Sequence, residues 1–288
     1  MISAEFVWPD GLDPDTVCFS VDVEWAAEAV VADVSSLFNE HGVAATFFVT
    51  HDGVSVPGHE RGLHPNFRRS GDTYRAFPNS GAASDEDIYE HVISTTLGFA
   101  PEAKGVRAHS LFYDSVLLPI YRRFGIEYDS SYHLPFVANL RPFWKHDDIV
   151  EIPIFYGDHL DLAIGTTGFE LPRLGLDQPG LKVFNFHPNI IYLNPPDAAA
   201  YAAAKSYYRN PERLLAARHH GRGTRTLLAE LLDYVRSRNV PTATLGRVNE
   251  LMRGATDRRP AVGSRGADSQ QRGREDHIGA PPIRRRRR

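Results

Sequence analysis

The chain has 288 residues, of which 42% are hydrophobic and 24% charged, which is typical of folded globular proteins and excludes disordered and fibrous classes. Its single cysteine, Cys18, excludes an intrachain disulfide and a cysteine-cluster zinc site, and favours a reducing compartment. The first residues lack the basic and apolar regions of a signal peptide, and no apolar run is long enough to span a bilayer. We therefore expect a cytoplasmic protein with no membrane span.

Charge is unevenly distributed along the chain. The net charge is −4, but residues 256–288 contain ten arginines and four acidic residues, so residues 1–255 carry −10. The 256–288 segment is poor in large apolar residues and rich in Gly, Pro, Gln and Arg, which predicts a disordered tail. Its final run of arginines has the charge to contact nucleic acid or anionic lipid, but it makes no strong case for a nucleic-acid function.

Between residues 16 and 245, short apolar strand-like segments alternate with helix-like segments. In chain order, we expect a strand at 16–24, a helix at 25–40, a strand at 43–50, a turn-rich segment at 58–67, a loop at 70–84, a helix at 85–97, a strand at 105–109, a helix at 110–124 kinked by Pro119, strands at 126–132, 148–155 and 181–188, a helix at 224–237 and a strand at 240–245. Strand and helix repeated about seven times predict a parallel sheet in one domain, residues 1–255. At this length a barrel is favoured over an open doubly wound sheet.

Polar residues cluster where the predicted strands end. They are Asp22, Glu24, His64, Arg107, His109, Asp129 and His187. In parallel α/β folds, functional sites are built at the edge formed by the carboxyl ends of the strands. This distribution predicts that the site lies at that edge.

Two of these residues, Asp22 and Glu24, are spaced to lie on the same side of one strand. Two carboxylates held that close repel each other unless a cation lies between them, and a divalent metal would provide one. The alternative is that one carboxylate faces solvent while the other caps the following helix. The spacing alone does not decide between these two interpretations.

Three histidines strengthen the metal interpretation. His64 follows two strong strands, and His109 and His187 each end or interrupt an otherwise apolar strand. One such histidine is usually a hydrogen-bonded core residue, but three of them with two carboxylates predict a zinc site with an open position for water. His133, an isolated loop histidine, is instead expected to be a solvated polar residue.

Five segments occur in the order found in polysaccharide deacetylases of the NodB-homology group, and the chain resembles that family. They are FSVDVEW (19–25), ATFFVT (45–50), GHERGLHPNF (58–67), VRAHSLFYDS (106–115) and FNFHPN (184–189). The resemblance covers about residues 15–250 and is nearest to the divergent deacetylases of surface-polysaccharide and O-antigen gene clusters. It implies a deformed (β/α) barrel with about seven parallel strands, and hydrolysis of an N-acetyl group from an amino sugar or saccharide with one divalent metal, expected to be Zn²⁺.

The resemblance also implies roles for five residues. Asp22 matches the general base, and Glu24 matches the metal-binding acid, displaced by one position from the usual adjacent pair of aspartates. His64 matches the first metal-binding histidine. Arg107 matches the arginine that orients the base, and His187 matches the histidine that donates a proton to the leaving amine.

The sequence departs from the family pattern at one metal ligand. The family has a second metal-binding histidine four residues after the first, but this chain has Arg68 there, and arginine cannot bind a cation. The arginine motif continues with Ala108 and His109 where the family has a proline, so we predict that His109 replaces the missing ligand. Without it, the site would keep only Glu24 and His64, with Asp22 as a further candidate.

Two other functions remain open at this point. One is a saccharide-binding barrel that has lost catalysis, and the other is a metal-dependent hydrolase of another non-peptide C–N bond. A pure binding protein has no need of Asp22, Arg107 and His187 together, so the trio favours an enzyme. The sequence specifies neither the exact sugar nor the oligomeric state.

Overall fold

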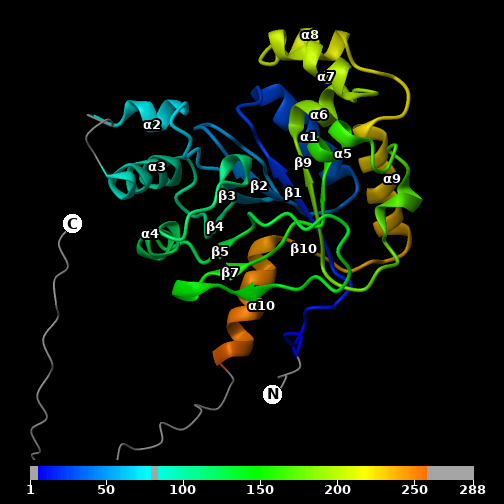
Figure 1. Cartoon of the computed structure of the whole chain (residues 1–288). Helices are drawn as coiled ribbons and strands as arrows, with labels where there is room; N and C mark the ends of the chain where they lie inside the picture. The colour runs from blue at the N-terminus through cyan, green and yellow to red at the C-terminus, as the bar shows by residue number, and fades with distance from the viewer. Residues whose placement is uncertain (1–5, 79–83, 258–288) are drawn as a thin grey trace, which may run out of the picture. The chain divides into compact units, whose positions relative to one another are not determined.

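A curled, mostly parallel β-sheet lies at the centre of the protein, shown in Figure 1 as a computed structural model that describes residues 6–78 and 84–257. The strands are β1 (Val17–Asp22), β2 (Thr46–Val49), β3 (Glu60–Leu63), β4 (Gly105–Val106), β5 (Tyr128–Asp129), β6 (Phe143–Trp144), β7 (Val150–Glu151), β8 (Tyr156–Gly157), β9 (Lys182–Phe186) and β10 (Thr242–Ala243). Their order is β6-β7-β5-β4-β3-β2-β1-β9-β8, and β10 pairs with β1. Among the described strands, β6 alone runs antiparallel to its neighbour. The predicted α/β fold with a deformed, barrel-like parallel sheet is confirmed.

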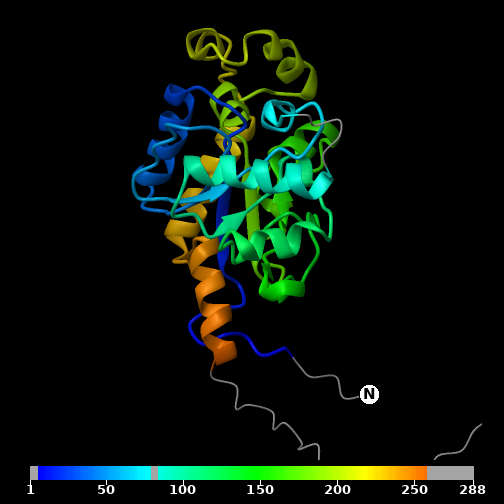
Figure 2. The same cartoon turned by 90° about the vertical axis from the view of Figure 1, so that its left-hand side faces the viewer.

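Helices cover the outside of this sheet (Figure 2). They are α1 (Glu28–Glu40), α2 (Asp72–Ala76), α3 (Asp85–Phe99), α4 (Leu117–Arg123), α5 (Asp158–Ile164), α6 (Pro188–Leu193), α7 (Ala198–Ala204), α8 (Pro211–Ala216), α9 (Thr224–Ser237) and α10 (Leu245–Asp257). Helix α6 packs against both α1 and α9, and α3 packs against α2 and α4. Helices α7 and α8 lie at one end of the sheet and α10 at the other (Figure 1).

The central strand β1 is buried along its whole length between β2 and β9. Its apolar run is continuous because parallel strands in the middle of a sheet are covered on both faces. Phe19 packs edge-on against Phe38 of α1, at 5.6 Å between ring centroids, and stacks on Phe184 of β9 at 6.2 Å. These contacts attach α1 and β9 to β1 and thereby fix the edge where both strands end.

A close approach inside the sheet positions a buried arginine. A Cβ atom at Gly62 of β3 would lie 2.7 Å from the ring of Phe48 on β2, so only glycine fits there. The guanidinium of Arg107 also lies over the Phe48 ring, 4.4 Å from its centroid. Gly62 and Phe48 thus help to set where Arg107 lies within the curl of the sheet.

Several local predictions need correction. The 58–67 segment is not only turns, because Glu60–Leu63 form β3. The 70–84 segment contains α2. Helix α4 begins at Leu117, so Pro119 lies in its first turn and produces no kink, since an N–H there would have no acceptor within the helix. The presence of β3 places His64 directly after a strand rather than within a loop.

The predicted boundary between a catalytic domain and a tail falls at the end of α10. Residues 258–288 lie outside the described residues, so the disordered tail at 256–288 remains a prediction. Within the described ranges, no helix is both long and apolar enough to cross a membrane.

Candidate metal and catalytic site

The six predicted site residues meet at the carboxyl edge of the sheet. Asp22 is the last residue of β1, and His64, Arg107 and His187 follow directly after β3, β4 and β9. Backbone hydrogen bonds extend the strand pairing to these positions, from His64 N to Val49 O at 2.8 Å and from Arg107 N to Leu63 O at 2.9 Å. Asp129 lies at the same edge but pairs with Lys145 at 2.8 Å, in a separate ion-pair cluster.

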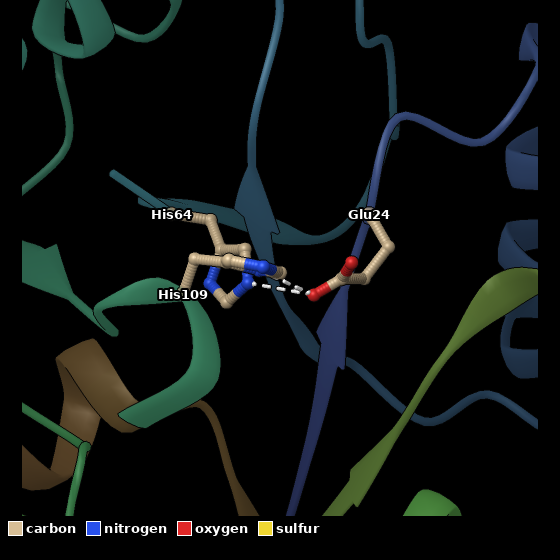
Figure 3. Close-up of side chains that lie close together, drawn as sticks. All are labelled: Glu24, His64 and His109. Atoms are coloured by element: carbon tan, nitrogen blue, oxygen red, sulfur yellow. Dashed lines mark hydrogen bonds and ion pairs between the residues drawn. The ribbon is translucent and has the colours of Figure 1, made fainter. Parts of the chain in front are cut away.

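Glu24, His64 and His109 form one compact group of metal-binding side chains (Figure 3). Glu24 Oε1 lies 3.2 Å from His64 Nε2 and 2.8 Å from His109 Nδ1. The two imidazole rings meet edge to face, with centroids 5.4 Å apart. The sequence prediction that these three side chains lie together agrees with the geometry.

Glu24 reaches this group through an unusual backbone conformation. The strand ends at Asp22, and Glu24 and Trp25 both have positive φ, 51° and 53°. Such conformations are uncommon for residues other than glycine and persist only where surrounding contacts hold them. Trp25 N donates to Thr50 Oγ1 at 3.0 Å, and the Trp25 ring packs edge-on against His109. The expectation that Asp22 and Glu24 lie on the same side of one strand is therefore wrong, because the strand ends at Asp22 and a left-handed turn positions Glu24.

The geometry and electrostatics of this group fit a divalent cation. Ligands of tetrahedral zinc, at ~2.0–2.1 Å from the ion, lie about 3.3 Å from one another, close to the separations between Glu24 Oε1 and the two imidazole nitrogens. Burial acts to raise the pKa of Glu24, but hydrogen bonds from His109 and His64 outweigh it and hold the pKa well below its usual range. The carboxylate is therefore ionised and ready to bind a cation.

Arg68 occupies the position where the family has a second metal-binding histidine. It lies on the surface, and its backbone N–H donates to Asn66 Oδ1 in a local turn. It is not among the three side chains that converge. His109, from the turn after β4, supplies the third group instead.

Asp22 is buried beside the metal-binding group and is held at both carboxylate oxygens. Arg107 Nη1 donates to Oδ1 at 3.0 Å, and Asn185 Nδ2 donates to Oδ2 at 2.8 Å. Burial acts to raise the pKa of Asp22, but the charges of Arg107, His64 and His187 and the Asn185 hydrogen bond lower it to about 2. Asp22 is thus a fixed, ionised carboxylate.

Arg107 is fully buried and makes hydrogen bonds with all three of its nitrogens. Its Nε donates to Ser130 O and its Nη2 to Ser130 Oγ, both at 2.7 Å, while Nη1 also reaches Ser20 Oγ and Asn185 Oδ1. A buried charge requires such pairing and hydrogen bonding to be tolerated. Among these partners Asp22 is the one that carries a charge, so the guanidinium of Arg107 is paired with the Asp22 carboxylate.

His187 is oriented by a buried carboxylate that the sequence analysis missed. Its Nδ1 lies 2.6 Å from Asp158 Oδ1, and its backbone N–H donates to Asp158 Oδ2 at 2.8 Å. Burial acts to lower the pKa of His187, but Asp158, with Asp22 and Glu24, raises it to about 9. His187 Nε2 faces the site and lies 3.8 Å from Asp22 Oδ2.

Asp22, Glu24 and His187 line a cavity of about 240 Å³. Its lining residues are Asp22, Glu24, Ser110, Leu111, His133, Ile154, Gly157, His159, Asn185 and His187. An ionised carboxylate, a protonated imidazole and Glu24, one of the three metal-binding side chains, therefore share one cavity. Hydrolysis of an amide or ester is the chemistry that such an arrangement can perform.

Comparison with known proteins identifies the family. A model of WbmS-like polysaccharide deacetylases matches residues 19–205, more than half of the chain. The chain belongs to this family. A crystal structure of WbmS from Bordetella bronchiseptica, a polysaccharide deacetylase involved in O-antigen biosynthesis, is 27% identical to this chain, with 76% of this chain and 90% of WbmS covered and a TM-score of 0.65. No curated protein sequence matches this chain.

The fold has a second counterpart at lower identity. A polysaccharide deacetylase from Mycobacterium smegmatis is 17% identical, with 87% of this chain and 95% of that chain covered and a TM-score of 0.53. The match to the WbmS-like family and to WbmS confirms the resemblance to deacetylases of O-antigen gene clusters. Membership of the WbmS-like polysaccharide deacetylases supports a carbohydrate deacetylase and does not favour a barrel that only binds saccharide.

The candidate site contains further residues that were not predicted from the sequence. Asn185, which holds Asp22, carried a usable signal, because it is a polar residue within an apolar strand and lies two positions before His187. Asp158 gave none, since its pairing with His187 depends on β8 and β9 lying side by side. His133 and His159 line the cavity, so the expectation that His133 is a solvated loop residue is wrong.

Asp158, His159 and His187 form a second group with metal-binding atoms. In this group, however, both carboxylate oxygens of Asp158 already accept hydrogen bonds from His187. Such a carboxylate–histidine pair fixes one imidazole nitrogen and leaves the other to exchange protons. We therefore interpret this group as a proton donor with its orienting acid.

Proposed function

We propose that this protein is a metal-dependent hydrolase that removes an N-acetyl group from an amino sugar or saccharide. The observation that carries the proposal is the convergence of Glu24, His64 and His109 next to the Asp22–Arg107 pair. Family membership supports the same substrate class. The residues present supply a metal-binding group, a base and an acid, which are the groups that amide hydrolysis requires.

We assign Glu24, His64 and His109 as the ligands of one ion, and Zn²⁺ as the ion that fits them. One carboxylate with two imidazoles is a ligand set of catalytic zinc sites, in which a fourth position stays open. A bound zinc polarises a carbonyl oxygen and lowers the pKa of a water from 15.7 to ~7. The chain's own contribution is to hold the three ligands and to keep Asp22 and His187 near them.

Asp22 acts as the general base in this proposal. With a pKa of about 2, it is ionised at any pH where the protein works, and its oxygens are fixed by Arg107 and Asn185. It can accept the proton of the water that attacks the acetyl carbonyl. Arg107 orients Asp22 without contacting the substrate, so it is a positioning residue.

His187 acts as the general acid. Because Asp158 occupies Nδ1, the proton available to the substrate is on Nε2, which faces the cavity. A pKa of about 9 keeps this proton in place at neutral pH. Transfer of the proton to the nitrogen as the C–N bond breaks lets the amine leave as a neutral group.

Acetate release tests this function. The purified, zinc-loaded protein is incubated with N-acetylated monosaccharides, nucleotide sugars and oligosaccharides, and acetate and free amine are both measured. We expect equal amounts of both from at least one saccharide, and none after chelation of the metal. Ring opening of cyclic amides, detected as new free amino groups, with no hydrolysis of any saccharide would instead support a hydrolase of another C–N bond.

Metal binding should depend on His64 and His109 and not on Arg68. We expect His64→Ala to lose the ion and His109→Ala to lower zinc affinity by at least the ~10–100-fold seen when a supporting group around a metal is removed. Arg68→Ala, at the family's usual ligand position, is the matched control and should bind zinc as wild type does. The measurement is zinc titration of each folded variant. Unchanged affinity in His109→Ala would remove His109 from the ligand set.

The pH dependence should reveal the pairing of His187 with Asp158. Because Asp158 raises the pKa of His187 above its usual value, the acid is protonated below about pH 9 and activity should fall as pH rises through that value. Asp158→Asn removes the main charge that raises this pKa, so the alkaline limb of the rate profile should shift to lower pH.

The matched control for this shift is Asp161→Asn, which removes another buried charge from α5. The Asp161 carboxylate accepts hydrogen bonds from Tyr156 and Thr167 rather than from His187. Asp161→Asn should lower stability without moving the alkaline limb. An unchanged limb in Asp158→Asn would show that His187 is not the group whose proton is required.

A further inference from the structure

Two imidazoles form the wall of the cavity on the β8 side. His133 is held by a parallel bridge to Ile154, and His159 lies in the first turn of α5. Gly157 makes room for His133, because a Cβ atom there would lie only 3.2 Å from His133 Cε1, whereas His159 Cε1, at 3.6 Å, would be in ordinary contact. Neither histidine is needed for the acid, the base or the metal.

His133 has a buried polar atom without a partner. Its Nε2 is inaccessible to solvent and forms no hydrogen bond with the described residues. Burial, with the charges of His159 and Arg107, lowers the pKa of His133 to about 4, so its ring is neutral at neutral pH. Buried polar atoms are almost always paired in folded proteins, and because His133 lines the cavity, a small rotation of its ring would bring Nε2 to a partner on a bound molecule. A hydroxyl group can serve either as donor or as acceptor to a neutral imidazole nitrogen.

The positions assigned to the carbonyl and the nitrogen of the substrate indicate that the sugar lies against this wall. The acyl carbonyl belongs at Glu24 and its neighbouring ligands, and the nitrogen belongs at His187, which protonates it. The ring of His159 lies 5.0 Å from that of His187, and Gly157, which contacts His133, pairs with Asn185 on the neighbouring strand. The group attached to the nitrogen therefore extends from His187 toward His159 and His133.

Space for a sugar continues past His133. A second cavity of about 200 Å³ shares His133 and Gly157 with the first, and its other side chains include the apolar Pro135, Phe136 and Leu160. The polar side chains of Tyr156, Asp161 and Thr166 also line it. A pyranose has hydroxyl groups at its edges and apolar C–H faces, so a wall that combines apolar and polar side chains suits it.

We propose that His133 is a substrate-binding residue whose Nε2 hydrogen-bonds a hydroxyl of the sugar, at a subsite formed with His159 and Gly157. This inference rests on the proposed function, since it uses the positions assigned to the carbonyl and the amine. It concerns recognition of the sugar and gives His133 no part in bond cleavage.

The experiment measures sugar binding without turnover. Zinc-loaded Asp22→Asn protein is titrated calorimetrically with N-acetylglucosamine, N-acetylgalactosamine and their monodeoxy analogues. Adding His133→Phe, which replaces the imidazole by an aromatic ring without nitrogens, should weaken binding about 10-fold, the loss of one hydrogen bond. His133→Gln, which retains hydrogen-bonding groups, should restore part of it. One monodeoxy sugar should bind about 10-fold more weakly when His133 is present and show no such penalty in His133→Phe.

A second variant keeps the proposal testable if His133→Phe fails to fold. Gly157 has an ordinary φ of −137°, so its backbone tolerates Gly157→Ala. The added Cβ would lie 3.2 Å from His133 Cε1, so the His133 ring has to shift. In otherwise wild-type protein Gly157→Ala should raise KM for the saccharide several-fold and leave kcat nearly unchanged.

The outcomes separate this inference from the proposed function. Equal sugar affinity in parent and His133→Phe, or no binding of either sugar to the parent, overturns the subsite. Sugar binding that depends on His133, with no acetate released by wild-type protein, upholds the subsite and contradicts the hydrolase.

Discussion

Replacing Asp22 by asparagine should lower the rate of acetate release by about 10²–10⁴-fold, the range assigned to general acid–base catalysis. The amide has the shape of the carboxylate but cannot accept the proton of the attacking water. Because Asp22 is not one of the three converging metal-binding side chains, zinc content should not change. Rate and bound zinc are measured on the same preparation. The matched control is Asp233→Asn, on an exposed side chain of α9, which should leave both unchanged.

Two results would contradict this assignment. Full activity with zinc bound would exclude Asp22 as the base and, with it, the mechanism proposed above. Loss of zinc in Asp22→Asn would instead make Asp22 a metal ligand. Asp22 Oδ1 lies 4.0 Å from His64 Nδ1. The zinc content of Asp22→Asn therefore tests directly whether Asp22 is the base, with Glu24 as the metal-binding carboxylate, or is itself a ligand.

Replacing Arg107 by leucine should destabilise the protein by about 3–5 kcal/mol, the loss expected when one partner of a buried ion pair is removed. Arg107 is fully buried, and its loss removes the cation that contacts the Asp22 carboxylate directly, at 3.0 Å, and leaves His187 at 3.8 Å as a more distant partner. Urea denaturation monitored by circular dichroism measures the change in the free energy of unfolding. The pKa of Asp22 should also rise, because the Arg107 charge contributes to holding it at about 2.

A double-mutant cycle identifies the cause of this destabilisation. In the Asp22→Asn background no carboxylate charge is left unpaired, so Arg107→Leu should cost less there, by the ~0.5–3 kcal/mol typical of directly contacting residues. An identical loss in both backgrounds would show that the bonds to Ser130 and Ser20, rather than the pair with Asp22, account for the effect.

The long elements of the fold were predictable from sequence because their patterns are long enough to read. The continuous apolar runs of β1, β2 and β9 and the periodicity of α1 and α9 gave the parallel α/β architecture. The exception among the long elements is α10, which was missed, as were the two-residue strands β6 and β8 and the short helices α5 to α8. Segments of two to seven residues carry little periodicity, and contacts with neighbouring elements decide their conformation.

The candidate site was predictable to the extent that strand ends located it. Asp22, His64 and His187 lie next to strands whose ends share one edge of the sheet. The position of Glu24 depends on two consecutive left-handed residues, and that of Asp158 on the adjacency of β8 and β9. Such features arise from tertiary structure, and no local pattern of residues announces them.

The most direct test of this account is a crystal structure of zinc-soaked protein, with anomalous diffraction collected at the zinc edge. We predict one strong peak coordinated by Glu24, His64 and His109, with metal–ligand distances of ~2.0–2.2 Å. Asp22 and His187 should lie next to this peak without binding the ion. A peak at Asp158, His159 and His187, or no peak at Glu24 in a protein that releases acetate, would contradict the assignment of the metal site on which the mechanism depends.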